Sequence, residues 1–245
     1  MHIAMLSEKL SDSRVRCNIC QWRCAVNPGK SGICKMYRNI DGVLYNMNYA
    51  QASSLAIDPI EKKPLSHFFP CSSVYSLGGW GCNFHCRDCQ NWQIACVEAP
   101  ESWRGSKEIQ PQEAVVEAKC HNCTGIAWTY NEPTMWFEYT LESAKLAKQN
   151  DLYTVYVTNG YMTPEALDTI GPYLDAWRVD VKGFTDEIYR YLAKITNWRS
   201  ILEVAKRAKN KWNMHVEVVT NVIQTINDDD EQLGGIASWI REDLG

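Results

Sequence analysis

Five short apolar runs, separated by segments with helical periodicity, constrain the fold of this chain more than any other feature. Most are too apolar to have a face in water, which is typical of parallel strands buried on both sides. They lie at residues 74–81, 124–131, 152–160, 176–184 and 214–223. Because repeated βα units with right-handed crossovers build either a (β/α) barrel or an open doubly wound sheet, the sequence predicts an α/β fold of one of these kinds.

Helical patterns fill the intervals between the runs. Thr163 and Pro164 predict the N-cap and first turn of a helix that Gly171 ends. Two later segments carry apolar residues at helical spacing. These residues are Ile201, Val204, Ala205 and Ala208 in one segment, and Leu233, Ile236, Ala237 and Ile240 in the other.

Polar residues follow each of the five runs. Cys82 comes after the first, Asn131 and Glu132 after the second, Thr158 and Asn159 after the third, Asp180 and Lys182 after the fourth, and Thr220 and Asn221 after the fifth. In both candidate folds, reactive groups collect at the carboxyl ends of the strands. We therefore expect one shared site built from five strand ends.

Three cysteines crowd the segment "GCNFHCRDCQNW" (81–92), at Cys82, Cys86 and Cys89. Cysteine thiolates bind zinc or iron–sulfur clusters. A closed zinc site takes four ligands, whereas three thiolates on a [4Fe–4S] cluster would leave one iron open. The cluster is favoured at the mouth of a βα fold, but a zinc site completed by His85 or Cys96 is the alternative.

Composition narrows the function classes. The 245 residues are 45% hydrophobic, which suffices for one good-sized core, and the net charge of −4 disfavours nucleic acid as a partner. No run of 18 apolar residues predicts a membrane span, and the first 14 residues lack the apolar centre of a signal peptide. We expect a cytoplasmic protein with no membrane partner, whose eleven cysteines serve metal binding or thiol chemistry.

The first 70 residues contain a second cysteine group with spacing C-x2-C-x3-C-x9-C, at Cys17, Cys20, Cys24 and Cys34. We interpret residues 1–70 as a cysteine-rich metal-binding module with an extended lead-in, and residues 71–245 as the α/β unit. Zinc would hold a small module together and is the favoured metal. A second iron–sulfur cluster is the alternative.

The motif C-x3-C-x2-C after the first strand of a βα fold resembles the radical S-adenosylmethionine (SAM) superfamily. In that family the open iron of the cluster chelates the amino and carboxylate groups of SAM. Reduction of the cluster, by a donor such as flavodoxin or ferredoxin, cleaves SAM to methionine and a 5′-deoxyadenosyl radical. The resemblance thus implies Cys82, Cys86 and Cys89 as cluster ligands at the catalytic centre.

Three further segments resemble SAM-contact motifs of the family. "TYNEPT" (129–134) implies that Glu132 faces the SAM ammonium, with the backbone of Tyr130 and Asn131 beside it. "VTNG" (157–160) implies that Thr158 and Asn159 lie near the ribose, and "DVK" (180–182) implies that Asp180 and Lys182 lie near the SAM carboxylate.

A narrower resemblance rests on "IDPIEKKPLSHFFP" (57–70), "GCNFHCRDCQNW", "AWTYNEPT" (127–134) and the N-terminal cysteines. Together they resemble the radical SAM enzyme of the AmmeMemoRadiSam system, a relative of pyruvate formate-lyase activating enzymes. The resemblance implies a partial (β/α)6-type barrel. Because only five strands are visible, we expect either a truncated or split polypeptide or a barrel more open than usual.

Two positions depart from the family pattern. Asp88 stands where an aromatic residue usually precedes the third cysteine beside adenine, and Trp92 is in a different register. Val157 stands where glycyl-radical activases have an aspartate that helps to hold a monovalent cation. We therefore expect neither adenine stacking at residue 88 nor a cation site at residue 157.

Three functions follow from these patterns. The first is a radical SAM enzyme that abstracts hydrogen from an unidentified substrate. The second, within the same class, is an activase that acts on the glycine backbone of a partner enzyme, so that a protein is one possible substrate. The third is a non-catalytic zinc or iron–sulfur protein, such as a scaffold or redox sensor.

Overall fold

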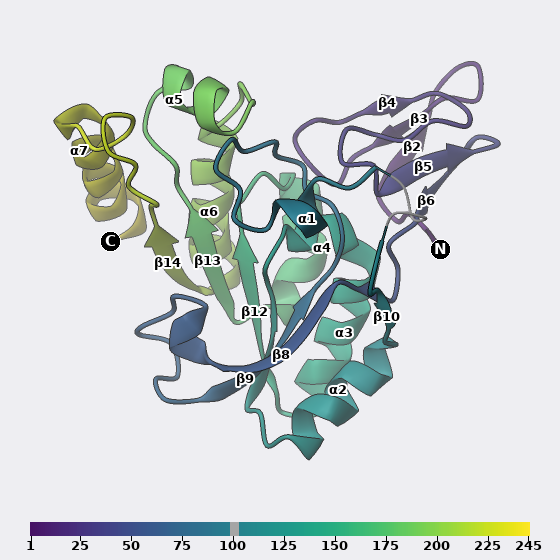
Figure 1. Cartoon of the computed structure of the whole chain (residues 1–245), viewed down its shortest axis with the longest axis horizontal. Helices are drawn as coiled ribbons and strands as arrows, with labels where there is room; N and C mark the ends of the chain where they lie inside the picture. The colour runs from purple at the N-terminus through teal and green to yellow at the C-terminus, as the bar shows by residue number, and fades with distance from the viewer. Residues whose placement is uncertain (99–102) are drawn as a thin grey trace.

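A six-stranded sheet forms the centre of the computed structural model, which describes residues 1–98 and 103–245. Five of its strands are parallel to one another and correspond to the five predicted runs (Figure 1). They are β9 (Ser73–Gly78), β11 (Gly125–Trp128), β12 (Tyr153–Thr158), β13 (Ala176–Asp180) and β14 (His215–Val219). They neighbour one another in chain order, without the reversal of a doubly wound sheet, so the partial barrel is the observed alternative.

An antiparallel edge strand, β8 (Ser54–Pro59), pairs with β9 and completes the sheet. The sequence predicted only an extended lead-in here. The proline at residue 59 lacks a backbone N–H and fits at the end of an edge strand, where no further ladder bond is needed. The division of the chain at residue 70 remains a prediction, although β8 belongs to the large sheet.

A row of aromatic side chains crosses the sheet. Trp128, Tyr156 and Trp177 are cross-strand partners on β11, β12 and β13 and are fully buried. The rings of Tyr156 and Trp177 stack with centroids 5.7 Å apart, and Trp128 meets Tyr156 edge-on at 5.8 Å. Such cross-strand pairs stabilise one register, since a slip by one residue would move all three rings to the other face.

The chain segments that connect the parallel strands form helices that cover the sheet. They include α2 (Pro111–Cys120), α3 (Phe137–Gln149), α4 (Pro164–Ile170) and α6 (Arg199–Trp212). Thr163 caps α4 as expected, because its hydroxyl accepts from the Ala166 amide. The predicted apolar stripe of α6 is buried. The shorter α1 (Trp92–Ala95) and α5 (Asp186–Leu192) lie near the carboxyl ends of the strands.

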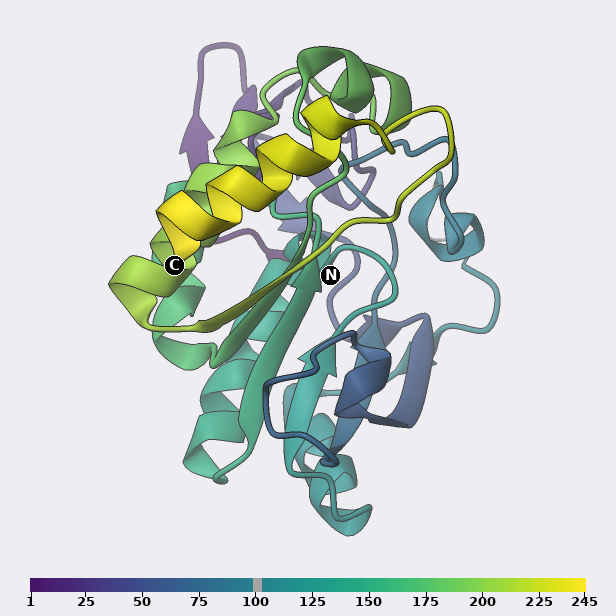
Figure 2. The same cartoon turned by 90° about the vertical axis from the view of Figure 1, so that its left-hand side faces the viewer.

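The last helix, α7 (Asp230–Trp239), forms where predicted but buries a different stripe. Leu233 and Ala237 are exposed, and the buried positions are Gln232, Ile236 and Trp239. The side-chain oxygen of buried Gln232 accepts from the Phe184 amide at 2.6 Å. This face of the helix is therefore turned toward the loop after β13. Figure 2 shows α7 lying diagonally across this side of the molecule.

The N-terminal segment forms small antiparallel sheets beside the large one. One contains β1 (His2–Ile3), β6 (Val43–Asn46) and β5 (Tyr37–Ile40), and another contains β2 (Ser7–Lys9), β3 (Val15–Cys17) and β4 (Ala25–Val26). A short pair joins β7 (Gln51–Ala52) to β10 (Lys107–Glu108). Buried Glu138 of α3 binds the N-terminal segment to this helix. Its carboxylate accepts from the Tyr37 hydroxyl at 2.8 Å and from the Met5 amide at 3.0 Å. No helix in the described part of the chain is long and apolar enough to cross a membrane.

Candidate functional site

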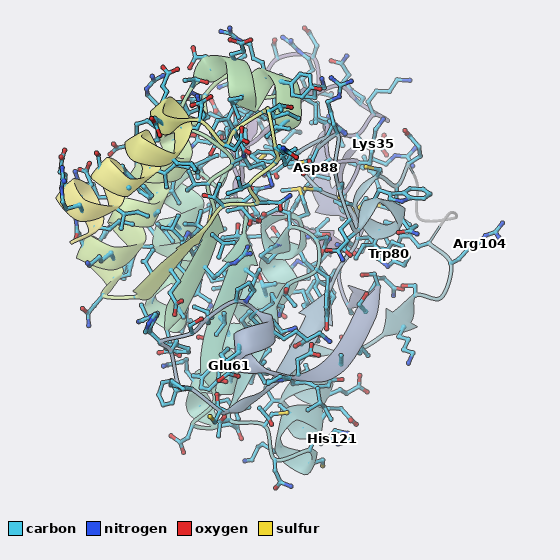
Figure 3. The ribbon with its side chains drawn as sticks, turned by 60° about the vertical axis from the view of Figure 1, so that its left-hand side comes forward. Lys35, Glu61, Trp80, Asp88, Arg104 and His121 are labelled. Atoms are coloured by element: carbon cyan, nitrogen blue, oxygen red, sulfur yellow. The ribbon has the colours of Figure 1, made fainter. Side chains whose placement is uncertain are left out.

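A pocket of about 750 Å³ opens at the carboxyl ends of the strands, and its wall includes residues at or just after the end of each of the five parallel strands. Its lining includes Cys82, Cys86, Cys89, Tyr130, Asn131, Glu132, Asn159, Asp180, Lys182, Thr220 and Asn221. Figure 3 shows Asp88, which also lines it, at the opposite end of the molecule from Glu61 and His121. The structure thus brings together residues that the sequence spreads over 140 positions, as the strand-end argument predicted.

The three cysteines lie on the loop between β9 and α1. The Phe84 amide donates to Cys82 Sγ at 3.4 Å, and the Asn91 amide is a donor to Cys89. Burial raises the pKa of all three thiols, that of Cys86 to about 11, and Lys182 acts in the opposite direction on Cys86 and Cys89. Thiols held in such a place lose their protons when a metal displaces them.

Glu132 is the buried anion of the site, with its side chain 1% exposed. Its Oε1 accepts from the Thr134 amide at 3.0 Å and from the Thr158 hydroxyl at 2.7 Å, and its Oε2 accepts from the Asn159 amide at 2.8 Å. Burial raises the pKa of Glu132, although these donors oppose that effect. A carboxylate oxygen accepts more than one bond, so Oε2 keeps capacity for a donor from the pocket.

Asn159 joins the second and third strand ends to the cysteine loop. Its side-chain amide donates to Asn83 Oδ1 at 2.7 Å and lies 3.7 Å from Cys82 Sγ, while its Oδ1 accepts from the Tyr161 amide at 3.0 Å. Thr158, by contrast, is buried behind the wall and reaches the pocket only through Glu132. The sequence did not single out Asn83, although its position directly after Cys82 was a usable signal.

Two cationic side chains lie at the end of β13. Arg178 is paired with a carboxylate, and Lys182 has no such partner among the described residues. Arg178 Nη1 donates to Asp180 Oδ1 at 2.7 Å. No carboxylate of residues 1–98 or 103–245 lies within ion-pairing distance of Lys182 Nζ, so Asp180 and Lys182 are not a plain ion pair. Burial alone would lower the pKa of Lys182, but Asp180 and Cys86 outweigh it and raise the pKa. Lys182 therefore remains charged and available to an anion in the pocket.

Two buried polar atoms on the pocket wall have no hydrogen-bond partner among the described residues: Asn131 Oδ1, an acceptor, and Arg178 Nε, a donor. Buried polar groups are usually paired, and polar groups of a ligand in the pocket could pair with these two atoms. SAM has an ammonium and a carboxylate, and a [4Fe–4S] cluster takes thiolates. The donor set of three cysteines, an acceptor, an anion and an unpaired lysine therefore fits both groups.

A polar network at the pocket rim was missed by the sequence analysis. Asp58 Oδ2 accepts from Lys63 Nζ at 2.5 Å and from the Tyr130 hydroxyl at 2.7 Å, and its Oδ1 accepts from Lys62 at 2.7 Å. Lys63 is only 2% exposed and lies over the Tyr130 ring at 4.6 Å. These residues belong to the quoted segment "IDPIEKKPLSHFFP", but nothing in its composition predicted a contact with the second strand end.

The expectations for adenine stacking at Asp88 and for a cation at Val157 stay predictions. Asp88 accepts from the Asn221 side chain at 3.3 Å, and Trp92 on α1 is 59% exposed. Asn91, next to Trp92, donates to the Tyr130 carbonyl at 2.5 Å and thereby fixes the cysteine loop to the second strand end.

The four N-terminal cysteines line a separate, enclosed cavity with Ile19, Trp22, Ile33, Tyr37 and Met135. Among the described residues no group of three or more His, Cys, Asp or Glu side chains is placed so that it could hold one metal ion. A [4Fe–4S] cluster does not need such convergence, because each iron takes its own thiolate. The nature of any N-terminal metal remains a prediction.

Comparison with known proteins identifies the class. The sequence model of the Radical SAM superfamily matches residues 79–236, which span the sheet and the pocket just described. The chain therefore belongs to the radical SAM superfamily, whose members are enzymes.

Three individual proteins are similar to this chain in sequence. An uncharacterized protein of Methanocaldococcus jannaschii (MJ0808) is 41% identical over the full 245 residues, which match 72% of that protein. A putative glycyl-radical enzyme activating enzyme of the same organism (MJ1632) is 25% identical over 65% of this chain and 60% of its own length. Pyruvate formate-lyase 1-activating enzyme of Escherichia coli K12 is 24% identical over 66% of each chain.

One solved structure supports the fold. The crystal structure of Streptococcus suis SuiB aligns with 70% of this chain and 36% of its own, at a TM-score of 0.51 and 13% identity. At this identity the likeness concerns the fold alone.

Proposed function

We propose that this chain is a radical SAM enzyme in which Cys82, Cys86 and Cys89 hold a [4Fe–4S] cluster and the pocket above them binds SAM. When bound and reduced, these groups supply a 5′-deoxyadenosyl radical that takes hydrogen from a substrate. The observation that carries the proposal is the convergence of the cysteine loop, Glu132 and unpaired Lys182 on one pocket. Each comes from a different strand end, so a purely structural metal site would not require them together.

The protein's own residues have distinct parts in this proposal. Lys182 would pair with the SAM carboxylate, since the described carboxylates leave it unpaired. Glu132 and Asn131 Oδ1 would accept from the SAM ammonium, the first as an anion and the second as an acceptor that the described residues leave unpaired. Asn159 would hold Glu132 and the Cys82 loop in fixed relation. Such positioning is how a protein contributes to cofactor chemistry.

The experiment is electron paramagnetic resonance on anaerobically reconstituted, dithionite-reduced protein, with and without SAM. A Cys82/Cys86/Cys89→Ala variant removes the cluster ligands, and a Cys120→Ala variant, exposed at the end of α2, is the matched control. We expect a cluster signal that shifts with SAM, persists in the control and is absent from the triple variant. A signal indifferent to SAM, or zinc in place of iron, would instead support the non-catalytic alternative.

A second candidate, a glycyl-radical activase, is favoured by the similarity to activating enzymes of M. jannaschii and E. coli. It predicts that the hydrogen comes from a glycine Cα of a protein. Proteins extracted from cells fed with deuterated glycine provide the probe, and proteins labelled with deuterated alanine provide the control. Deuterium in 5′-deoxyadenosine with the glycine label alone would support the activase. Its absence, together with SAM cleavage, would leave the radical enzyme with another substrate.

A further inference from the structure

We propose that the mouth of the pocket is a docking surface for a polypeptide segment in which a carboxylate side chain lies beside an apolar one. The inference rests on the proposed function, since the docked segment would present to the pocket the residue that loses hydrogen. Three large side chains are exposed at the mouth: Trp92 at 59%, Val222 at 52% and Tyr191 at 43%. They belong to α1, to the segment after β14 and to α5, which lie at the carboxyl ends of the strands (Figure 1).

Two of these side chains stand directly beside residues of the pocket wall. Trp92 follows Asn91, which lines the pocket and donates to the carbonyl at the second strand end. Val222 follows Asn221, which lines the pocket and donates to Asp88 of the cysteine loop at 3.3 Å. A ligand that extends out of the pocket would therefore meet both apolar side chains at once.

The exposure of Trp92 distinguishes it from the other tryptophans. All ten tryptophans lie in the described part of the chain, and Trp92 is the only one that is exposed rather than buried or half-buried. A large apolar side chain next to a polar pocket marks an interaction site more often than a scattered surface residue does. Tryptophan, tyrosine and arginine are also the residues that most often carry the binding energy of protein interfaces. A small molecule held inside the pocket would leave Trp92 in water, whereas a polypeptide would cover it.

Two cationic side chains flank the third exposed residue, Tyr191. The Arg87 guanidinium lies 4.4 Å from the centroid of the Tyr191 ring, and the Lys194 ammonium lies 5.9 Å from it. Within residues 1–98 and 103–245, neither cation has a carboxylate at ion-pairing distance, and both are exposed. A guanidinium pairs with a carboxylate through two parallel hydrogen bonds. This corner of the mouth therefore selects a carboxylate, although the chain as a whole carries a net charge of −4.

The backbone holds this corner in place without a partner. The Arg87 amide donates to the Leu192 carbonyl at 3.0 Å, and the His85 amide donates to the Ala193 carbonyl at 3.4 Å, so the cysteine loop is joined to the end of α5. Lys194 follows with φ 61°, in the left-handed region that glycine most often occupies after a helix. A corner that is already ordered loses less conformational entropy when a partner binds.

The first test is fluorescence anisotropy of a labelled random copolymer of glutamate and tyrosine, added to the anaerobically reconstituted, SAM-loaded protein. A copolymer of lysine and tyrosine is the matched control probe. Because the chain carries a net charge of −4, non-specific attraction would favour the lysine copolymer. We expect the glutamate copolymer to bind about 10-fold more tightly than the lysine copolymer, and added salt to weaken it. Equal binding of the two, or no binding of the glutamate copolymer, would overturn the docking surface.

The second test repeats the titration with Arg87→Gln/Lys194→Gln, which removes the cationic corner, and with Trp92→Ala, which removes the apolar contact. We expect the dissociation constant of the glutamate copolymer to rise about 5- to 30-fold in each variant, as for interface residues of this kind. All three side chains are exposed, so the fold should not depend on them. An unchanged dissociation constant in both variants would show that the copolymer binds elsewhere.

Matched controls remove similar side chains away from the mouth. Arg241→Gln/Lys30→Gln removes two exposed cations, and Val116→Ala shortens a side chain of α2 that is 57% exposed; none of these residues lines the pocket. The controls should bind the glutamate copolymer as the unaltered protein does. A similar loss in the controls would contradict a site at the mouth.

Electron paramagnetic resonance separates this inference from the proposed function. The SAM-dependent shift of the cluster signal should persist in Arg87→Gln/Lys194→Gln and in Trp92→Ala. Its loss from these variants alone would place the side chains in the SAM site and overturn the docking surface. Its absence from the unaltered protein would instead count against the proposed function, while the preference between the two copolymers would still report on docking.

Discussion

The Asn159 amide donates to Glu132 Oε2 at 2.8 Å, joining the end of β12 to the end of β11. The same asparagine reaches the cysteine loop through Asn83 Oδ1 at 2.7 Å. A change at any of these three positions therefore affects the geometry of the other two.

Glu132→Gln should weaken both the fold and SAM binding. The new NH₂ group would face donors that now bond to the carboxylate, among them the Thr158 hydroxyl and the Asn159 amide. Leaving a buried donor unpaired costs about 1–3 kcal/mol, which denaturant unfolding would measure. Glu117→Gln, on the exposed face of α2, should change the free energy of unfolding little. Equal stability of the two variants would contradict the network.

The pH dependence of that loss has a defined sign. Because burial raises the folded-state pKa of Glu132, the folded protein holds a proton that the unfolded chain has released at pH values between the ordinary glutamate pKa and the raised one. The contribution of this group is therefore full below the ordinary glutamate pKa and is lost as pH rises through the folded pKa. Glu132→Gln should remove this decline. The difference in the free energy of unfolding between the two proteins should therefore shrink as the pH rises above 4.5.

Lys182→Met should reduce SAM affinity while leaving the cluster in place. Hydrogen bonds to charged groups contribute about 1.5–3 kcal/mol, so the SAM dissociation constant should rise about 10- to 150-fold. Titration calorimetry would measure this change, and iron analysis would show the cluster retained. Lys148→Met, whose ammonium pairs with Asp175 at 2.6 Å away from the pocket, should bind SAM normally. A shared defect in both variants would argue against a specific role for Lys182.

Asp58→Asn should destabilise the protein at neutral pH, because it leaves Lys63 buried without its anion. Removing one partner of a buried pair costs about 3–5 kcal/mol. Burial opposes ionisation of Asp58, but bonds from Lys62, Lys63 and Tyr130 dominate and lower its pKa. Its contribution is therefore present above the unfolded pKa and lost as pH falls through the folded pKa, so the gap between the two proteins should narrow below about pH 4. A gap that stays constant down to pH 3 would show that Asp58 is not held ionised.

Gly160→Ala should destabilise the fold and disturb the Asn159 turn. Gly160 has φ +73°, and an added Cβ would lie 2.8 Å from Ile201 and 2.9 Å from Val179. Left-handed backbone strain costs about 1–3 kcal/mol before the clash is added. Gly29→Ala, also at φ +73° but with no atom within 4 Å of its Cβ, separates strain from crowding. Thermal unfolding should show a larger loss for Gly160→Ala than for Gly29→Ala.

Much of the site could be predicted from local sequence, since strand order and carboxyl-end geometry follow from the alternation of apolar runs and helices. Cys82, Asn131, Glu132, Asn159, Asp180 and Lys182 all border one pocket, as that rule requires. The pattern could not distinguish Thr158, which is buried behind Glu132, from Asn159, which faces the pocket. One step along a strand reverses the face, and local composition does not specify which residue is inward.

The sequence by itself determined the α/β class, the five parallel strands and the cysteine spacing, because these depend on periodicity and on residue chemistry. Only the tertiary structure decided that β8 closes one edge of the sheet, that Asp58 and Lys63 meet Tyr130, and that Arg178, rather than Lys182, pairs with Asp180. The contacts of β8 and Asp58 join residues far apart in the chain, and the choice of partner for Asp180 depends on which cation the packing turns toward it. The free energy of such contacts depends on packing and desolvation, which no local pattern encodes.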